Sequence, residues 1–224
     1  MPGLEEIKPG LHRWTARMPD WTPDQGGAEG WAPEVACVAY EAKDALVLID
    51  PLVADGDWSE IDSLAERHGG PIALVTTCPW HARSSGVALE RYGNSPGIEA
   101  WAHSVAMADE KRMTFEVANV VEERARVAEG VETFATDTGN GELTVWIEPI
   151  RTVVAADVLI GAEAERTQAL RVCPEAWLDG ATTVGCVKDA LRPLLSREVE
   201  AIVPLHGAPV LSGASEALRG ALGN

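Results

Sequence analysis

Short runs of β-forming residues alternate with segments of helical spacing along this chain, and the alternation limits the folds open to it. The predicted strands are residues 34–42, 45–51, 72–78, 98–103, 142–149, 151–161 and 200–207. The predicted helices are residues 57–68, 84–92, 105–113, 181–196 and 212–222. Strand pairs that alternate with helices in each half of the chain predict an α/β (α+β) sandwich with the helices outside the sheets.

Several helix ends carry local signals. Asp57 is a predicted N-cap for the helix that follows it, because its side chain can accept a hydrogen bond from a free backbone N–H. Glycine at 69–70 and at 93 predicts the ends of the first two helices. Pro193 lies inside the predicted helix 181–196, so that helix must kink or end early.

Length and composition predict one domain over residues 1–224. The chain is long enough for a substantial core, and 46% of its residues are hydrophobic, as in an ordinary globular protein. Residues 19–33 are rich in proline, glycine and aspartate and predict a surface loop. No secretory signal or apolar run of membrane-spanning length is visible, so we expect a cytoplasmic location.

The formal net charge of −17 limits the kinds of partner that we expect for the protein. Such a surface repels phosphates, so neither nucleic acid nor an anionic membrane is an expected partner. A small-molecule ligand and a homo-oligomer both remain possible partners. Cysteines 37, 78, 173 and 186 form no CxxC pair and predict free thiols. The eight tryptophans are spread along the sequence, which therefore predicts no cluster of them.

Four segments, in order, resemble the metallo-β-lactamase superfamily over nearly the whole chain. VLIDP at 47–51 is similar to the family's early strand that ends in Asp, and LVTTCPWHARSSG at 74–86 stands where the family reads T-H-x-H-x-D-H-x-G-G. VVAADVLIG at 153–161 is similar to the strand that presents a metal-binding Asp, and IVPLHG at 202–207 to the segment that presents the last His. The resemblance implies an αββα sandwich and a hydrolase that activates water with two zinc ions.

The sequence departs from that family pattern at the metal ligands. Cys78 and Trp80 stand at the first two His positions, Ala82 at the Asp and Arg83 at the third His. Residues 133–142 lack the His expected there, so Asp157 and His206 alone keep the family's residue types. Alanine offers no ligand atom, and Trp80 offers only an N–H donor on a ring whose bulk would fill the space of a metal. The sequence therefore predicts no dinuclear zinc site and no metal cofactor.

A shifted site is the alternative. His81 lies one position after the family's second ligand, and it either points to solvent or turns inward. Turned inward, it could join Cys78, Asp157 and His206 in a site for one zinc ion, since thiolate, imidazole and carboxylate all bind zinc.

Three functions follow from these alternatives. The first is a non-metal pseudoenzyme or small-molecule-binding protein whose pocket candidates are Trp80, His81, Arg83, Asp157 and His206. The second is a hydrolase with the reduced, mononuclear metal site. The third is a structural or interaction protein whose cleft is filled. We also expect Arg83 to form a salt bridge or a close contact with Asp157, because a cation there would compensate for the missing zinc charge.

Overall fold

The computed structural model describes residues 3–27, 29–94, 97–136, 138–163 and 166–223, and its strands form two sheets. The first sheet runs in the order β1-β2-β3-β4-β5-β6-β7. Its strands are Glu5–Lys8, Leu11–Arg17, Glu34–Glu41, Leu46–Ile49, Ile72–Val75, Ile98–His103 and Asn119–Val121. Strands β4 to β7 are parallel to one another, whereas β1 to β4 are antiparallel.

The second sheet runs in the order β12-β11-β10-β9-β8, and β13 pairs with β11. Strands β8 to β13 are Arg124–Ala128, Val131–Ala135, Leu143–Ile147, Thr152–Glu163, Arg166–Val172 and Ala201–His206. The β11–β13 pair is parallel, and the other pairs of this sheet are antiparallel.

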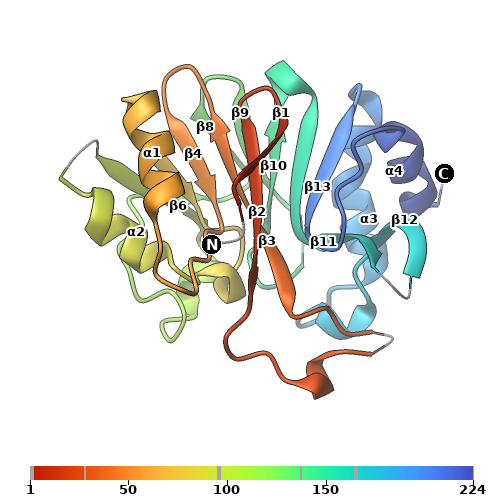
Figure 1. Cartoon of the computed structure of the whole chain (residues 1–224). Helices are drawn as coiled ribbons and strands as arrows, with labels where there is room; N and C mark the ends of the chain where they lie inside the picture. The colour runs from red at the N-terminus through yellow and green to blue at the C-terminus, as the bar shows by residue number, and fades with distance from the viewer. Residues whose placement is uncertain (1–2, 28, 95–96, 137, 164–165, 224) are drawn as a thin grey trace.

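The helices cover the outer faces of the two sheets. They are α1 (Ser59–His68), α2 (Ser85–Tyr92), α3 (Val184–Leu191) and α4 (Ala214–Leu222). Helices α1 and α2 lie against the first sheet, and α3 and α4 lie against the second (Figure 1). The prediction of an αββα sandwich is therefore confirmed.

Three apolar clusters hold the four layers together. One lies between the sheets and joins residues such as Val47 and Val75 to Val154 and Val203. A second packs Ile61 and Leu64 of α1 and Ala88 and Tyr92 of α2 on the first sheet, and a third packs α3 and α4 on the second. Strands β4, β5 and β13 are buried throughout, which explains why their sequences are apolar except for His206 at the end of β13.

Most predicted elements are present, with two corrections at the helices. The predicted helix 105–113 is wrong: only residues Ala106–Ala108 form a short 3-10 turn, because Asp109 accepts a hydrogen bond from the backbone N–H of Arg112 and ends the helical path. Asp57 accepts a hydrogen bond from the backbone N–H of Ser59, but the N-cap position is Trp58. Helix α3 ends at Leu191, two residues before Pro193, and continues as a 3-10 helix.

No helix in the described part of the chain is long and apolar enough to cross a membrane.

Candidate metal centre

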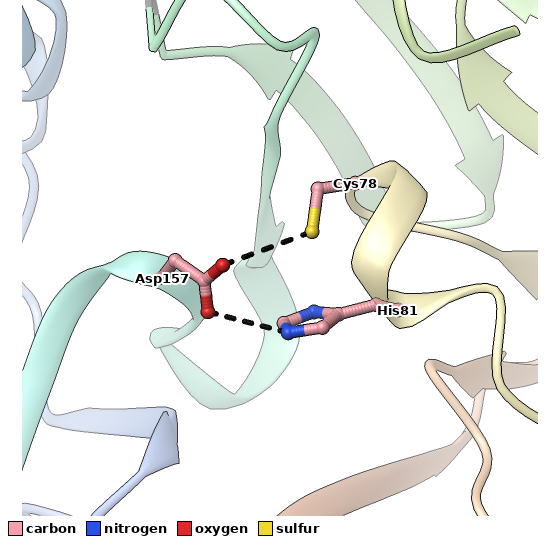
Figure 2. Close-up of side chains that lie close together, drawn as sticks. All are labelled: Cys78, His81 and Asp157. Carbon is pink, nitrogen blue, oxygen red and sulfur yellow. Dashed lines mark hydrogen bonds and ion pairs between the residues drawn. The ribbon is translucent and has the colours of Figure 1, made fainter. Parts of the chain in front are cut away.

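The candidate site lies where strand ends of both sheets meet. Strands β4 and β5 are parallel, so Asp50 and Thr77, which follow them, lie at the same sheet edge. The 3-10 turn Pro79–His81 then carries Cys78 and His81 toward the second sheet. Asp157 projects from β11 and faces both side chains (Figure 2).

Asp157 lies where β11 departs from regular pairing. The parallel register between β11 and β13 shifts between Ala155 and Ile160, on either side of Asp157. Buried Glu142 accepts a hydrogen bond from the backbone N–H of Val158 (2.8 Å), which this irregularity leaves free. Burial, and then the charge of Asp157, raises the pKa of Glu142 well above its ordinary value. Glu142 therefore helps to position Asp157 from behind.

His206 ends β13, and its imidazole reaches the same carboxylate. A close backbone approach makes this possible, since a Cβ atom built on Gly161 would lie 2.0 Å from the carbonyl oxygen of Ala208. Gly207 adopts a φ of 83°, which favours glycine. Glycine at these two positions thus lets the turn after His206 close against β11.

His81 is held between two carboxylates. Its Nδ1 lies 2.9 Å from Asp50 Oδ2, and its Nε2 lies 3.2 Å from Asp157 Oδ1. Burial and Arg83 lower the pKa of His81, but Cys78, Asp157 and Asp50 together raise it well above its ordinary value. The prediction left two orientations open for His81, and the side chain is turned inward and buried.

Asp157 Oδ1 is the atom on which two imidazoles converge. His206 Nε2 lies 3.0 Å from it and His81 Nε2 3.2 Å, both within ion-pair distance. The oxygen is buried, and among the described residues its contacts with these rings are ion-pair contacts rather than well-aligned hydrogen bonds. Burial would raise the pKa of Asp157, but His81 and then His206 hold it well below its usual range.

These residues suit one metal ion. Single ligand atoms of Cys78, His81 and Asp157 all lie within 4.8 Å of one another, and Cys78 Sγ lies 3.9 Å from Asp157 Oδ2. Zinc bonds of about 2.0–2.3 Å place the ligand atoms of a tetrahedral site about 3.3–3.8 Å apart. Thiolate, imidazole and carboxylate are zinc ligands, and Asp50 holds Nδ1 of His81 in the way that carboxylates orient metal-binding imidazoles. Burial raises the pKa of the Cys78 thiol to about 12, so a metal would have to displace its proton.

Comparison with solved structures identifies the fold. The DIM-1 metallo-β-lactamase superimposes with a TM-score of 0.70 at 12% identity, covering 99% of this chain and 96% of that one. The metallo-β-lactamase from Hirschia baltica gives a TM-score of 0.68 at 16% identity, with 99% and 97% covered. This chain has the metallo-β-lactamase fold. FIM-1 from Pseudomonas aeruginosa, a metallo-β-lactamase of the same fold in its mono-zinc form, gives 0.65 at 15% identity, with 100% and 96% covered.

The sequence itself matches no family profile and no curated protein.

Two predictions about side chains of this metallo-β-lactamase fold are wrong. The predicted salt bridge between Arg83 and Asp157 is not formed, since Nη1 of Arg83 donates to the carbonyl oxygens of Ala36 and Asp50 (3.1 Å each) and to Cys37 Sγ (3.9 Å). Asp157 finds its partners in His81 and His206 instead. Trp80 does not fill the space beside Asp157, because it is 42% exposed and stacks on Arg112 with 5.1 Å from guanidinium carbon to ring centroid.

Sequence reasoning also missed residues of the site. Asp50 served as an anchor of the resemblance, but its contact with His81 depends on the turn at Pro79–His81. Glu142 gave no signal at all. Trp31 and Trp177 flank His206 edge-on, with ring centroids 5.2 and 5.5 Å from that of the imidazole. Trp31 lies far from both Trp177 and His206 in the sequence. Only the fold brings such distant positions together.

Proposed function

We propose that this chain binds a single transition-metal ion, with zinc as the first choice, and hydrolyses a small molecule in the adjoining cavity. Cys78, His81 and Asp157 would hold the ion. The observation that carries the proposal is Asp157 Oδ1, a buried oxygen without a well-aligned hydrogen bond that faces two imidazole nitrogens. A buried carboxylate oxygen needs a cation or a donor, and a metal ion bound beside these imidazoles would supply one.

Three protein ligands are the number that catalytic zinc sites use, because the fourth position stays open. A zinc ion in such a site lowers the pKa of water to about 7. Asp50 fixes the ring of His81, and Thr77 fixes Asp50 through its backbone N–H (2.8 Å) and its hydroxyl. His206 lines the cavity beside Asp157 and is placed to take up or release a proton there.

A second candidate is a non-metal pseudoenzyme that binds a small molecule. It is favoured by the position of His81 between Asp50 and Asp157, since a protonated imidazole there supplies the positive charge that a metal would bring. Both candidates use the same cavity. The cavity of about 410 Å³ beside Asp157 and His206 favours both of these candidates over a structural protein with a filled cleft.

Metal analysis separates the two candidates. We expect protein purified without added zinc to hold about one metal ion per chain. Cys78→Ser and Asp157→Asn should lose it, and Cys186→Ser, which changes an exposed cysteine, should keep it. In the cobalt-loaded protein, a thiolate-to-cobalt absorption band should vanish with Cys78→Ser.

Other results would change the assignment. About two ions per chain would contradict a mononuclear site. No metal, together with a melting temperature that a chelator leaves unchanged, would favour the pseudoenzyme. Loss of the metal from His206→Ala would make His206 a fourth ligand and the site a closed, structural one.

A further inference from the structure

A cavity lined by tryptophan adjoins the candidate metal centre. Its volume is about 410 Å³, within the range of small-molecule sites. Its walls include half of the chain's eight tryptophans, which are Trp21, Trp31, Trp80 and Trp177. The rings come from the segment between β2 and β3, from the turn after β5 and from the turn after β12, so the fold gathers them at one edge.

Hydrogen bonds hold two of these rings in place. Trp21 donates its indole N–H to the carbonyl oxygen of Trp31 (3.1 Å), and Trp177 donates to that of Glu29 (2.7 Å). The second bond ties the segment between β2 and β3, which extends beyond the sheets in Figure 1, to the turn after β12. Since their polar atoms are occupied, these rings offer apolar surface to the cavity.

Two arginines line the cavity, Arg83 and Arg112, and Arg83 has no acidic partner among the described residues. No described carboxylate forms an ion pair with it, although the chain has 35 acidic and 18 basic residues. Its hydrogen bonds to carbonyl oxygens all leave from Nη1, and its Nε is buried without a hydrogen-bond partner. Its backbone φ of 37° is unusual for a side chain of this size, and strain of this kind gathers at ligand sites.

The other cation of the wall is already occupied. Arg112 pairs with Asp109 (2.5 Å) and stacks on Trp80. The acidic residues of the wall, Asp20, Asp157 and Asp179, would repel a ligand with several negative charges. Among the described residues, Nη2 of Arg83 donates no hydrogen bond and is not one of the buried atoms, so it is the donor that a carboxylate in the cavity can reach. A hydrogen bond between a guanidinium and a carboxylate is charge-assisted and therefore strong.

We propose that the cavity binds an aromatic small molecule that carries one carboxylate, with the rings packed among the tryptophans and the carboxylate on Arg83. Binding of this molecule needs no metal. The inference rests on the proposed function only where it makes the bound molecule the substrate of the hydrolysis.

The test uses 2-naphthoate as the probe and its uncharged analogue 2-naphthamide as the reference, with binding followed by calorimetry and tryptophan fluorescence. We expect the carboxylate to bind about tenfold more tightly than the amide, the scale of one charge-assisted contact. Arg83→Met should reduce naphthoate affinity to that of the amide, and Arg83→Lys should recover part of it. Arg67→Met, an exposed cation on α1, is the matched control and should change nothing. Trp177→Leu should weaken both probes, and Trp101→Phe, outside the cavity, should weaken neither.

Equal affinity of the two probes for the wild type, or full naphthoate affinity in a folded Arg83→Met, would overturn the inference. If Arg83→Met does not fold, the wild-type comparison of acid and amide still decides. Each titration is run on chelator-treated and on zinc-loaded protein. Naphthoate binding that needs zinc and ignores Arg83 would sink the inference and leave the metal proposal standing. If the protein takes up no metal but still binds naphthoate more tightly than the amide, the inference stands and the metal proposal fails.

Discussion

At the scale of single residues, Asp50 organises the site from the interior. It is fully buried and accepts hydrogen bonds from the backbone N–H of Thr77 (2.8 Å) and from the Thr77 hydroxyl, while His81 Nδ1 lies 2.9 Å away. Its φ of 48° is in the left-handed region, which aspartate tolerates better than most residues. The carboxylate thus links the end of β4 to the turn that carries His81.

Asp50→Asn should therefore destabilise the protein strongly. The change removes a buried negative charge from beside an imidazole, and breaking a buried pair costs about 3–5 kcal/mol. Chemical denaturation at neutral pH measures the loss. Asp189→Asn, which removes an exposed acid, should change the free energy of unfolding by less than about 0.5 kcal/mol and serves as the control. A loss for Asp50→Asn no larger than that of the control would show that the carboxylate carries no such role.

At the scale of elements, the outer helices are linked by charge as well as by apolar packing. Asp62 of α1 accepts hydrogen bonds from Arg91 Nε (2.7 Å), from Arg91 Nη2 and from the hydroxyl of Tyr92 (2.8 Å), both on α2. The hydrogen bonds from Arg91 hold the pKa of Asp62 below its ordinary value. Because the pKa is lower in the folded state, this contribution to stability is present above the unfolded pKa and is lost as the pH falls through the folded one.

Asp62→Asn should lower the free energy of unfolding by about 1 kcal/mol at pH 7, a modest value because Arg91 is partly exposed to solvent. Urea unfolding of wild type and variant at several pH values tests the sign. The difference between them should hold down to about pH 5 and shrink as the pH falls below about 4. A difference that stays constant down to about pH 3 would exclude the charged form of Asp62 as its cause.

At the scale of the whole molecule, each of the two sheets contributes part of the candidate site. The first sheet delivers Asp50, Thr77, Cys78 and His81 from strand ends that share one edge, and the second delivers Asp157 and His206 from the parallel pair β11–β13. Helices cover the outer faces of both sheets (Figure 1). The cavity opens at the edge where the strand ends of both sheets meet, beside Asp157 and His206. The layers therefore place the candidate site at the edge of the sandwich, where the strand ends of both sheets meet.

The net charge of −17 should make the thermal stability of the protein depend on salt. An excess of one sign destabilises the compact state through self-repulsion, and salt screens it. Raising the ionic strength from about 0.01 M to about 0.15 M shortens the screening length from about 30 Å to about 8 Å. We expect the melting temperature to rise over this range, equally with NaCl and KCl. A melting temperature that falls would mean that the screened ion pairs matter more than the repulsion.

Local patterns in the sequence predicted the helices α1 and α4 and the buried strands of the sandwich. Apolar runs such as residues 72–75 and 201–206 predict buried strands, and α1 and α4 follow from their spacing, because both signals are local. These patterns missed β1, β2, β7, β8, β9 and β12, several of them short and partly exposed. Such strands depend on their neighbours more than on their own residues.

The contacts of the candidate site follow from the tertiary structure. The residue types of the shifted site were readable, but the inward position of His81 involves a long-range contact, because its Nδ1 lies 2.9 Å from Asp50, 31 residues away. The pairing of Arg83 was predicted wrongly, because the carbonyl oxygens that it meets leave no mark in a sequence. The four tryptophans of the cavity come together for the same reason, since proximity in space follows from the path of the whole chain and not from any segment of it.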